Sequence, residues 1–212
     1  MAGIVIKTNE RVCIAGKTGS GKTYLARYLT RRLSRLVVID SKGSLGDWNL
    51  DPWSGKTEAD LRSGRKVRAR VLDDLRREPE EQYADLASII LRSGSVTVYI
   101  DELYAVVPPG SRPPPPLNAL WTRGREYGIG VWASTQRPVW VPLVALSEAE
   151  HFFMFRLTLN DDRRRMAEFM TEEVLSPFSD LHGFWYMAAA QDAPVFLPQL
   201  EVSTVKTKGA AP

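Results

Sequence analysis

The sequence of 212 residues predicts a three-layer α/β fold, in which a mainly parallel sheet lies between two layers of helices. Two observations predict it. Segments typical of buried strands alternate with segments of helical periodicity, and polar residues directly follow several of the expected strands, as at the carboxyl edge of a parallel sheet. The length suits one domain, which we assign to residues 1–200, with residues 201–212 as a frayed tail.

The first expected strand and helix flank a glycine-rich loop. Residues 12–15 are apolar, as in a strand buried on both faces, and an amphipathic segment begins a helix at Tyr24. Residues 36–40 form a second apolar run, which ends in Asp40. Residues 41–54 are rich in Gly, Asp and Trp and therefore predict a loop.

The same alternation continues to the end of the chain. After a short strand at residues 67–72, Pro79 begins a helix that has glutamates at its positive end and stops at Gly94. The apolar residues 96–100 predict a central strand. The proline-rich residues 108–116 exclude a regular helix or a central strand. The remaining expected elements are helices at residues 117–127 and 161–175, strands at residues 130–135 and 152–157, and a terminal hairpin of residues 184–189 and 194–197.

The loop after the first strand has the pattern G-x-x-x-x-G-K-[ST], which binds nucleoside triphosphates. Its glycines allow backbone conformations that other residues avoid, and they let N–H groups approach phosphate oxygens. The Lys22 ammonium is expected to neutralise the β- and γ-phosphates, and the Thr23 hydroxyl to hold Mg²⁺. The expected nucleotide-binding residues are Gly16, Lys17, Thr18, Gly19, Ser20, Gly21, Lys22 and Thr23.

Residues at the strand ends supply the expected catalytic groups. Because parallel strands end at one edge of a sheet, we expect five residues to converge there: Gly16, Asp40, Asp101, Glu102 and Gln136. Asp101 would anchor Mg²⁺, and Glu102 would deprotonate the attacking water as general base. The Gln136 amide offers a donor and an acceptor to the γ-phosphate and this water. The alternative for Gln136 is a polar residue that merely ends a strand.

Arg125, in the segment before residues 130–135, is the expected arginine finger. Its guanidinium would neutralise transition-state charge on the nucleotide of a neighbouring subunit, so this role requires an oligomer. A surface salt bridge to Glu126 or Asp101 is the alternative.

The charge distribution leaves nucleic-acid binding open. A net charge of +3 and a pI near 9.0 are too mild to establish it. Basic residues nevertheless cluster at residues 62–77 and at Arg27, Arg31 and Arg35. Each cluster is either a phosphate-contacting face or a solvated helix surface.

The cysteine and histidine content argues against a metal centre. Cys13 is the only cysteine in the chain, which excludes an internal disulfide. His151 and His182 lack ligand spacing and are expected to be structural. No apolar run approaches the roughly 18 residues of a membrane span, so we expect a soluble protein without direct membrane insertion.

The motifs together resemble the FtsK–HerA superfamily of DNA-pumping ATPases over about residues 10–160. The resemblance rests on GKTGSGKT, VYIDE, RGREYGIGVWASTQRP and LSEAEHFFMFRL, and on VVIDSKG with Asp40 and Lys42. It implies a RecA-like (ASCE) P-loop NTPase sandwich with a C-terminal hairpin, ATP and Mg²⁺ as cofactors, Arg125 as trans finger and Gln136 as sensor. Arg123 is the second candidate for the finger.

Chain length and the lack of added domains favour one subfamily, the genome-packaging ATPases of membrane-containing icosahedral viruses. This resemblance implies a pentameric or hexameric ring that drives double-stranded DNA into a preformed capsid, located in the host cytoplasm or at the virion vertex beside a portal membrane protein. A cellular or plasmid DNA motor of HerA or conjugative type is the second hypothesis. A nucleotide-binding assembly factor that moves no DNA is the third.

Overall fold

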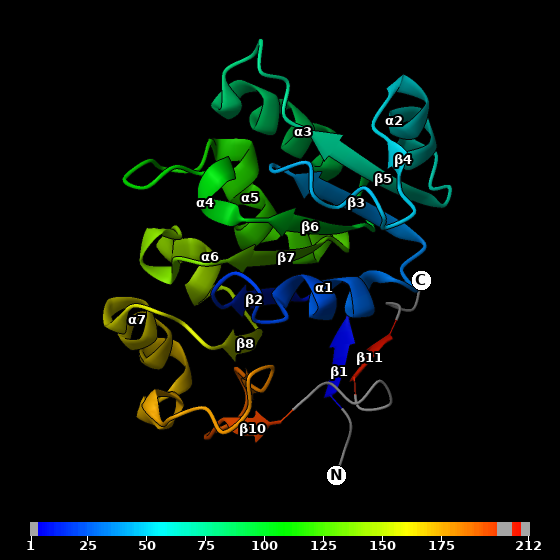
Figure 1. Ribbon diagram of the computed structural model, residues 1–212. Helices are drawn as coiled ribbons and strands as arrows, with labels where there is room; N and C mark the ends of the chain where they lie inside the picture. The colour runs from blue at the N-terminus through cyan, green and yellow to red at the C-terminus, as the bar shows by residue number, and fades with distance from the viewer. Residues whose placement is uncertain (1–3, 199–204, 209–212) are drawn as a thin grey trace.

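The computed structural model describes residues 4–198 and 205–208, and its centre is a nine-stranded sheet (Figure 1). Its strands are β2 (Arg11–Ala15), β3 (Arg35–Asp40), β4 (Asp51–Pro52), β5 (Val67–Leu72), β6 (Thr97–Asp101), β7 (Gly130–Thr135), β8 (His151–Phe155), β9 (Phe184–Ala188) and β10 (Val195–Leu197). The strand order is β10-β9-β8-β2-β7-β6-β3-β5-β4. All pairs from β8 to β4 are parallel, whereas β9 and β10 form an antiparallel hairpin beside β8. The predicted mainly parallel sheet and terminal hairpin are confirmed.

Helices connect the strands and cover both faces of the sheet. In the described residues they are α1 (Lys22–Thr30), α2 (Gly55–Arg62), α3 (Pro79–Ser93), α4 (Leu103–Val106), α5 (Pro115–Arg123), α6 (Leu143–Ser147) and α7 (Asn160–Met170). Three 3₁₀ helices add single turns at Gly124–Tyr127, Pro138–Trp140 and Glu172–Leu175. None of the helices in this part of the chain has the length and apolar character needed to cross a bilayer.

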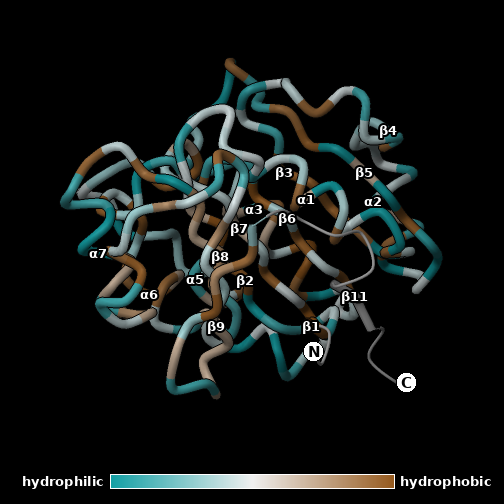
Figure 2. The backbone as a smooth tube through the Cα atoms, turned by 60° about the horizontal axis from the view of Figure 1, so that its bottom comes forward, coloured by the Kyte–Doolittle hydropathy of each residue, from teal (hydrophilic) through white to brown (hydrophobic). Residues whose placement is uncertain are grey.

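Alternate side chains of the strands enter two separate cores, which makes the fold three layers deep. On one face Val12 and Ile14 pack with Leu25 and Leu29 of α1. On the other face the neighbouring strand residues pack against α2, α3, α5, α6 and α7. Figure 2 shows the hydrophobic segments concentrated in the central strands. The buried strands owe their place to near-continuous apolar runs, as parallel strands covered on both faces require.

Several elements differ from the sequence prediction. The first strand, β1 (Ile4–Lys7), was not predicted, and it pairs in parallel with β11 (Val205–Lys208). The prediction of a frayed tail is therefore wrong for residues 205–208. Residues 201–204 and 209–212 of the predicted tail lie outside the described residues. The assignment of residues 1–200 to a single domain stays a prediction. Helix α2 was also missed, because its capping box places Thr57 where Glu or Gln is usual.

The proline-rich segment and two helices also differ in detail. Pro115 begins α5, where its missing N–H costs nothing, so the expectation that residues 108–116 hold no helix is wrong at their end. The helix predicted at 117–127 ends at Arg123 and continues as a 3₁₀ turn. The helix predicted at 161–175 breaks at Thr171, whose φ is 78°.

Candidate nucleotide site

The glycine-rich loop runs from β2 to α1 and is fixed by its neighbours in the sheet. The Gly16 N–H donates to Thr135 O at 3.0 Å, and the Lys17 N–H donates to Arg156 O at 2.9 Å. A Cβ on Gly16 would lie 2.6 Å from Phe155 Cβ, so a side chain cannot enter here. Gly21, with a φ of 110°, turns the chain into α1 in a conformation that disfavours other residues.

Lys22 is a buried cation that has lost most of its hydration. Its side chain reaches back over the loop, and Nζ donates to Lys17 O at 3.0 Å. Burial lowers the pKa of Lys22 to about 8, although the nearby carboxylates of Glu102 and Asp101 oppose this shift. A phosphate group beside Nζ would replace the missing hydration with opposite charge.

Asp101 ends β6 at the same edge of the sheet. Its Oδ1 accepts hydrogen bonds from the Tyr99 hydroxyl at 3.1 Å and from Ser134 Oγ at 3.0 Å. Burial raises the pKa of this carboxyl even though the two bonds oppose the shift. Asp101 is therefore oriented by fixed neighbours and would gain from a cation nearby.

Glu102 is held more tightly than Asp101. Its Oε2 lies 2.9 Å from Lys42 Nζ, and its Oε1 accepts the Gln136 N–H at 2.9 Å. The side chain is only 2% exposed, and the backbone has a φ of 64°, which is uncommon for a residue other than glycine. Such strain is often found at functional sites, and here it directs the carboxylate toward Lys42 and β7.

Gln136 closes the contact between β7 and the glycine-rich loop. Its backbone binds Glu102, while its side-chain Oε1 accepts the Thr18 hydroxyl at 2.9 Å. One residue thus links the loop to the acidic strand end.

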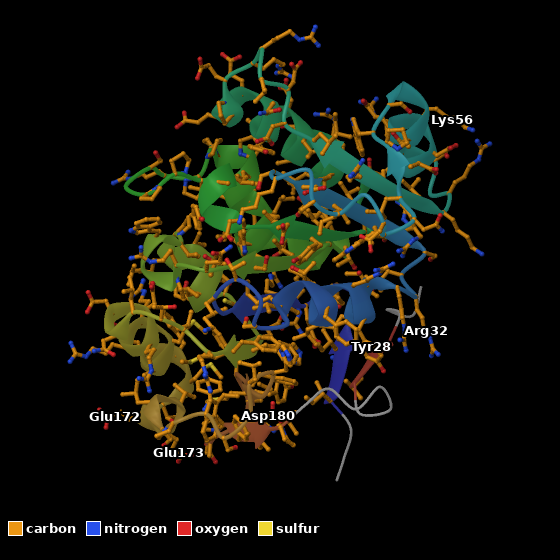
Figure 3. The ribbon with its side chains drawn as sticks, viewed as in Figure 1. Tyr28, Arg32, Lys56, Glu172, Glu173 and Asp180 are labelled. Atoms are coloured by element: carbon orange, nitrogen blue, oxygen red, sulfur yellow. The ribbon has the colours of Figure 1, made fainter. Side chains whose placement is uncertain are left out.

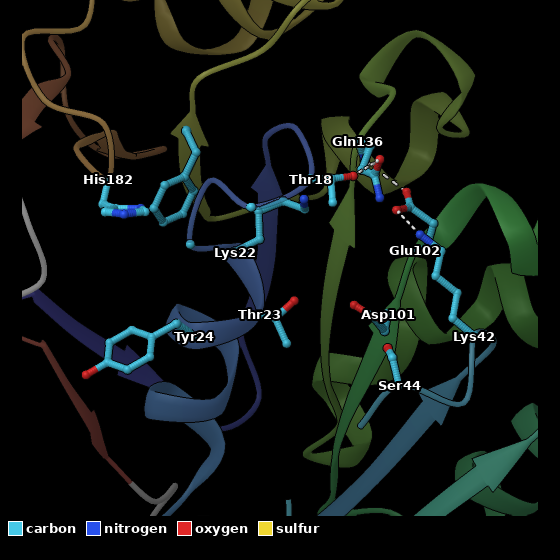
Figure 4. A pocket seen from close by; sticks show the side chains of 13 residues that line it. Thr18, Lys22, Thr23, Tyr24, Lys42, Ser44, Asp101, Glu102, Gln136 and His182 are labelled. Carbon is cyan, nitrogen blue, oxygen red and sulfur yellow. Dashed lines mark hydrogen bonds and ion pairs between the residues drawn. The ribbon is translucent and has the colours of Figure 1, made fainter. Parts of the chain in front are cut away.

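These groups line one cavity of about 570 Å³ (Figure 4). Its lining residues are Thr18, Gly19, Gly21, Lys22, Thr23, Tyr24, Lys42, Ser44, Asp101, Glu102, Gln136, Phe155 and His182. Strands β2, β7, β6 and β3 are consecutive neighbours in the sheet, which explains why residues far apart in sequence meet here. The volume is that of an ordinary small-molecule site.

The cavity suits a triphosphate with Mg²⁺. The buried Ser20 Oγ in the loop has no hydrogen-bond partner. A phosphate offers acceptor oxygens only, so this hydroxyl would act toward it as a donor. The described residues contain no cluster of three or more His, Cys, Asp or Glu that would hold a metal alone. Mg²⁺ is typically held by one or two protein oxygens together with substrate phosphates, and Thr23 and Asp101 offer such oxygens.

A comparison with known proteins found a relative by sequence. The chain is 26% identical over 204 residues to the DNA packaging ATPase P9 of Enterobacteria phage PRD1, and the match covers 89% of this chain and 87% of that protein. The predicted resemblance to viral genome-packaging ATPases is confirmed.

Solved structures show the same fold. The genome packaging NTPase B204 of Sulfolobus turreted icosahedral virus 2, in complex with ATP-gammaS, matches with a TM-score of 0.77 at 17% identity over 92% of this chain and 99% of that chain. VirB4 of Thermoanaerobacter pseudethanolicus matches with a TM-score of 0.64 at 12% identity over 90% and 89% of the two chains. No protein-family model matches the chain.

Two of the five strand-end residues expected in the site, Gly16 and Asp40, do not line the cavity. Gly16 lies in the phosphate loop, whereas Asp40 is buried beneath the neighbouring loop. Its fully buried carboxylate accepts the N–H groups of Ser44 at 3.0 Å and Leu45 at 2.9 Å. It therefore shapes the loop that carries Lys42 and Ser44 to the cavity wall. The expectation of direct convergence is wrong for Asp40, because its carboxylate binds the backbone of its own loop and the Arg70 guanidinium of β5.

Arg125 lies outside the cavity, in the 3₁₀ turn Gly124–Tyr127 before β7. Its guanidinium is 55% exposed and pairs with Glu150 at 2.7 Å, rather than with Glu126 or Asp101. The nucleotide cavity is at the other end of the strands, so Arg125 cannot serve the site of its own chain. Arg123 is also exposed.

The basic clusters are mostly engaged within the chain. Arg35 donates to four backbone carbonyl groups, and Arg68 donates to two. Acidic partners bind Arg27, Arg62, Arg65, Arg70, Arg76 and Arg77. Arg31 stacks on the Tyr28 ring at 3.8 Å, and Arg32 next to it is exposed at the edge of the molecule (Figure 3). Structural roles therefore explain most of these arginines.

The two histidines have different surroundings. His151 is buried, with its ring nitrogens 2.9 Å from the Tyr186 hydroxyl and 3.0 Å from Glu10 Oε2, which is the structural role expected. His182 instead lines the nucleotide cavity. Sequence reasoning missed it, together with Ser44 and Phe155, because no spacing rule links these residues to the phosphate loop. Tyr24 directly follows the loop but was assigned only to the helix.

Proposed function

We propose that this protein is an ATPase that drives double-stranded DNA into a viral capsid. One observation carries the proposal: a phosphate-binding loop faces a buried Asp-Glu pair across one cavity, in a chain that aligns over most of its length with a DNA packaging ATPase. The cavity supports triphosphate hydrolysis, and the relative supports DNA as the load.

Each part of the cavity has a role in this proposal. Backbone N–H groups of residues 16–23 bind the phosphates, and Lys22 neutralises their charge. Thr23 and Asp101 hold Mg²⁺, which when bound stabilises charge that develops on the phosphate oxygens. Glu102 accepts a proton from the attacking water. Lys42 and the Gln136 N–H fix the Glu102 carboxylate in place.

Gln136 acts as the sensor of the γ-phosphate. Its side chain already binds Thr18 of the loop and its backbone binds Glu102. A phosphate that displaces the Thr18 hydroxyl from the Gln136 side chain would alter the hydrogen bond between the Gln136 backbone and the general base Glu102. Binding of a phosphate in the loop and the position of the Glu102 carboxylate are thereby coupled.

Arg125 is proposed as the finger that completes the site of the next subunit, with Arg123 as the second candidate. Because Arg125 lies away from its own cavity, this role needs a neighbouring subunit, and a ring of five or six copies around the DNA would supply one. We place this ring at a capsid vertex or in the host cytoplasm, next to a portal protein.

The test is hydrolysis by wild type and Glu102→Gln, with and without duplex DNA. Wild-type turnover should rise with DNA, and Glu102→Gln should lower it by about 10² to 10⁴-fold while ATP still binds. The exposed Glu126→Gln is the matched control and should hydrolyse normally. Unchanged turnover in Glu102→Gln would remove Glu102 as base, and wild-type turnover that ignores DNA would remove the DNA motor.

A further inference from the structure

The nucleotide cavity has two chemically different ends. Toward β7, β6 and β3 it is lined by charged and amide groups, including Lys42, Glu102 and Gln136. Toward β8 it is lined by aromatic rings, which are Tyr24, Phe155 and His182. Figure 4 shows Tyr24 and His182 on the opposite side of Lys22 from Glu102 and Gln136.

The sheet order fixes the direction of a bound nucleotide. Strand β2 carries the phosphate loop and lies between β7 and β8. Hydrolysis requires the γ-phosphate near Glu102, which follows β6, so the remainder of the nucleotide must extend the other way. The nucleobase then lies on the β8 side, where the aromatic rings are.

Two of these three aromatic rings are exposed, and the third, Phe155, is buried. Tyr24 is 61% exposed on the first turn of α1, and His182 is exposed in the turn before β9. The Asp180 carboxylate holds that turn by accepting the His182 N–H at 2.9 Å. Phe155, only 2% exposed, packs its ring 3.1 Å from the position of a Cβ on Gly21. The exposed rings of Tyr24 and His182 therefore line the cavity together with the buried, closely packed ring of Phe155.

We propose that Tyr24 and His182 form the nucleobase slot and hold a purine by stacking. This inference rests on the proposed function only in needing a triphosphate in the loop. Aromatic rings stack on any base, because every base has a π-face. None of the cavity residues on this side is Asp, Asn, Glu, Gln or Arg, the side chains that read base edges best. The slot therefore accepts guanine nearly as well as adenine.

The test measures Kd by calorimetry for β,γ-methylene ATP, β,γ-methylene GTP and inorganic tripolyphosphate, in the presence of Mg²⁺. Tyr24→Ala should weaken both nucleotides by about 5 to 100-fold and leave tripolyphosphate within about twofold. His182→Ala should act in the same direction. Tyr24→Phe keeps the ring and should bind like wild type. Tyr127→Ala, an exposed tyrosine elsewhere, is the matched control, and a thermal melt checks that each variant is folded.

The expected ratio of the two nucleotide affinities in wild type is below about tenfold, whereas a site built on base hydrogen bonds discriminates by about 10⁴-fold or more. Equal losses for nucleotide and tripolyphosphate in Tyr24→Ala, or no loss in either, would overturn the slot, as would strong rejection of the guanine nucleotide. These outcomes are independent of DNA. A normal slot with no DNA-stimulated hydrolysis would refute the proposed function alone, and the reverse result would refute the slot alone.

Discussion

The two edges of the central sheet both carry clusters of charged residues, but only one has charges that lack full compensation. At the carboxyl edge Lys22 is buried with a lowered pKa, Asp101 is buried with a raised pKa, and Ser20 Oγ has no partner. At the amino edge Arg11 binds Trp121 O and Glu150, and Glu150 also binds Arg125. A count of charges does not separate a binding site from a structural cluster, whereas the balance of partners does.

The charged cluster at the amino edge extends into the core, where its side chains pair with one another. Glu10 accepts the Lys7 N–H at 2.7 Å and lies against His151, whose other ring nitrogen faces the Tyr186 hydroxyl. Each group has a partner on a different element. Such a network fixes the packing of the strands, and it pairs the charged groups of this edge, although the neighbouring Asn9 Oδ1 is buried without a partner.

Arg125 gives the largest expected effect, because it tests whether the amino edge of one subunit serves the carboxyl edge of the next. Arg125→Ala should lower hydrolysis by about 10³-fold or more, while its exposed salt bridge contributes at most about 1 kcal/mol to stability. Mixing Arg125→Ala with Lys22→Ala subunits should restore part of the turnover. No recovery at any ratio would contradict a finger in trans, and the same assay with Arg123→Ala would then decide the second candidate.

A substitution of Lys42 tests whether Glu102 needs its ion pair with Lys42 to act as general base. Lys42→Met should lower kcat by about 10 to 100-fold through misplacement of the carboxylate, with little change in KM. Lys42→Arg should retain more activity because it keeps the charge. A rise in KM with an unchanged kcat would instead make Lys42 a residue that only binds nucleotide.

A substitution of Lys22 tests, in the absence of nucleotide, whether burial of its positive charge destabilises the fold. The Lys22 pKa of about 8 lies below the 10.5 of a free lysine, so between these values the unfolded chain binds more protons and stability rises with pH. Lys22→Met should stabilise the free protein at pH 7 by about 1 to 3 kcal/mol, since each factor of ten in proton affinity is about 1.4 kcal/mol. Urea unfolding between pH 7 and 10.5 should show the slope in wild type and its loss in the variant.

Glu150→Gln gives the smallest expected effect on function. It weakens the pairs with Arg11 and Arg125, so a stability loss of about 1 to 2 kcal/mol is expected, measured by the same urea unfolding. Hydrolysis should stay within about threefold of wild type. A larger loss of turnover would mean that Glu150 positions Arg125 for the site of the next subunit.

The sequence by itself determined the fold class and the polar end of the cavity. The phosphate loop is a local motif, because its glycines and Lys22 act through the backbone of a few consecutive residues. Asp101, Glu102 and Gln136 were placed by a rule that depends only on strand ends in a parallel sheet. Apolar runs at the predicted period gave the central strands in the same way.

The tertiary structure alone decided the rest. Strand β1 and β11 lie at opposite ends of the chain, and no local pattern could pair them. Asp40 follows a strand like Asp101 does, yet the fold of its own loop takes both of its oxygens. His182 and Tyr24 meet at one cavity only because β9 lies next to β8 and β8 next to β2. Long-range pairing of strands sets such neighbours, and a linear sequence does not encode them in any short window.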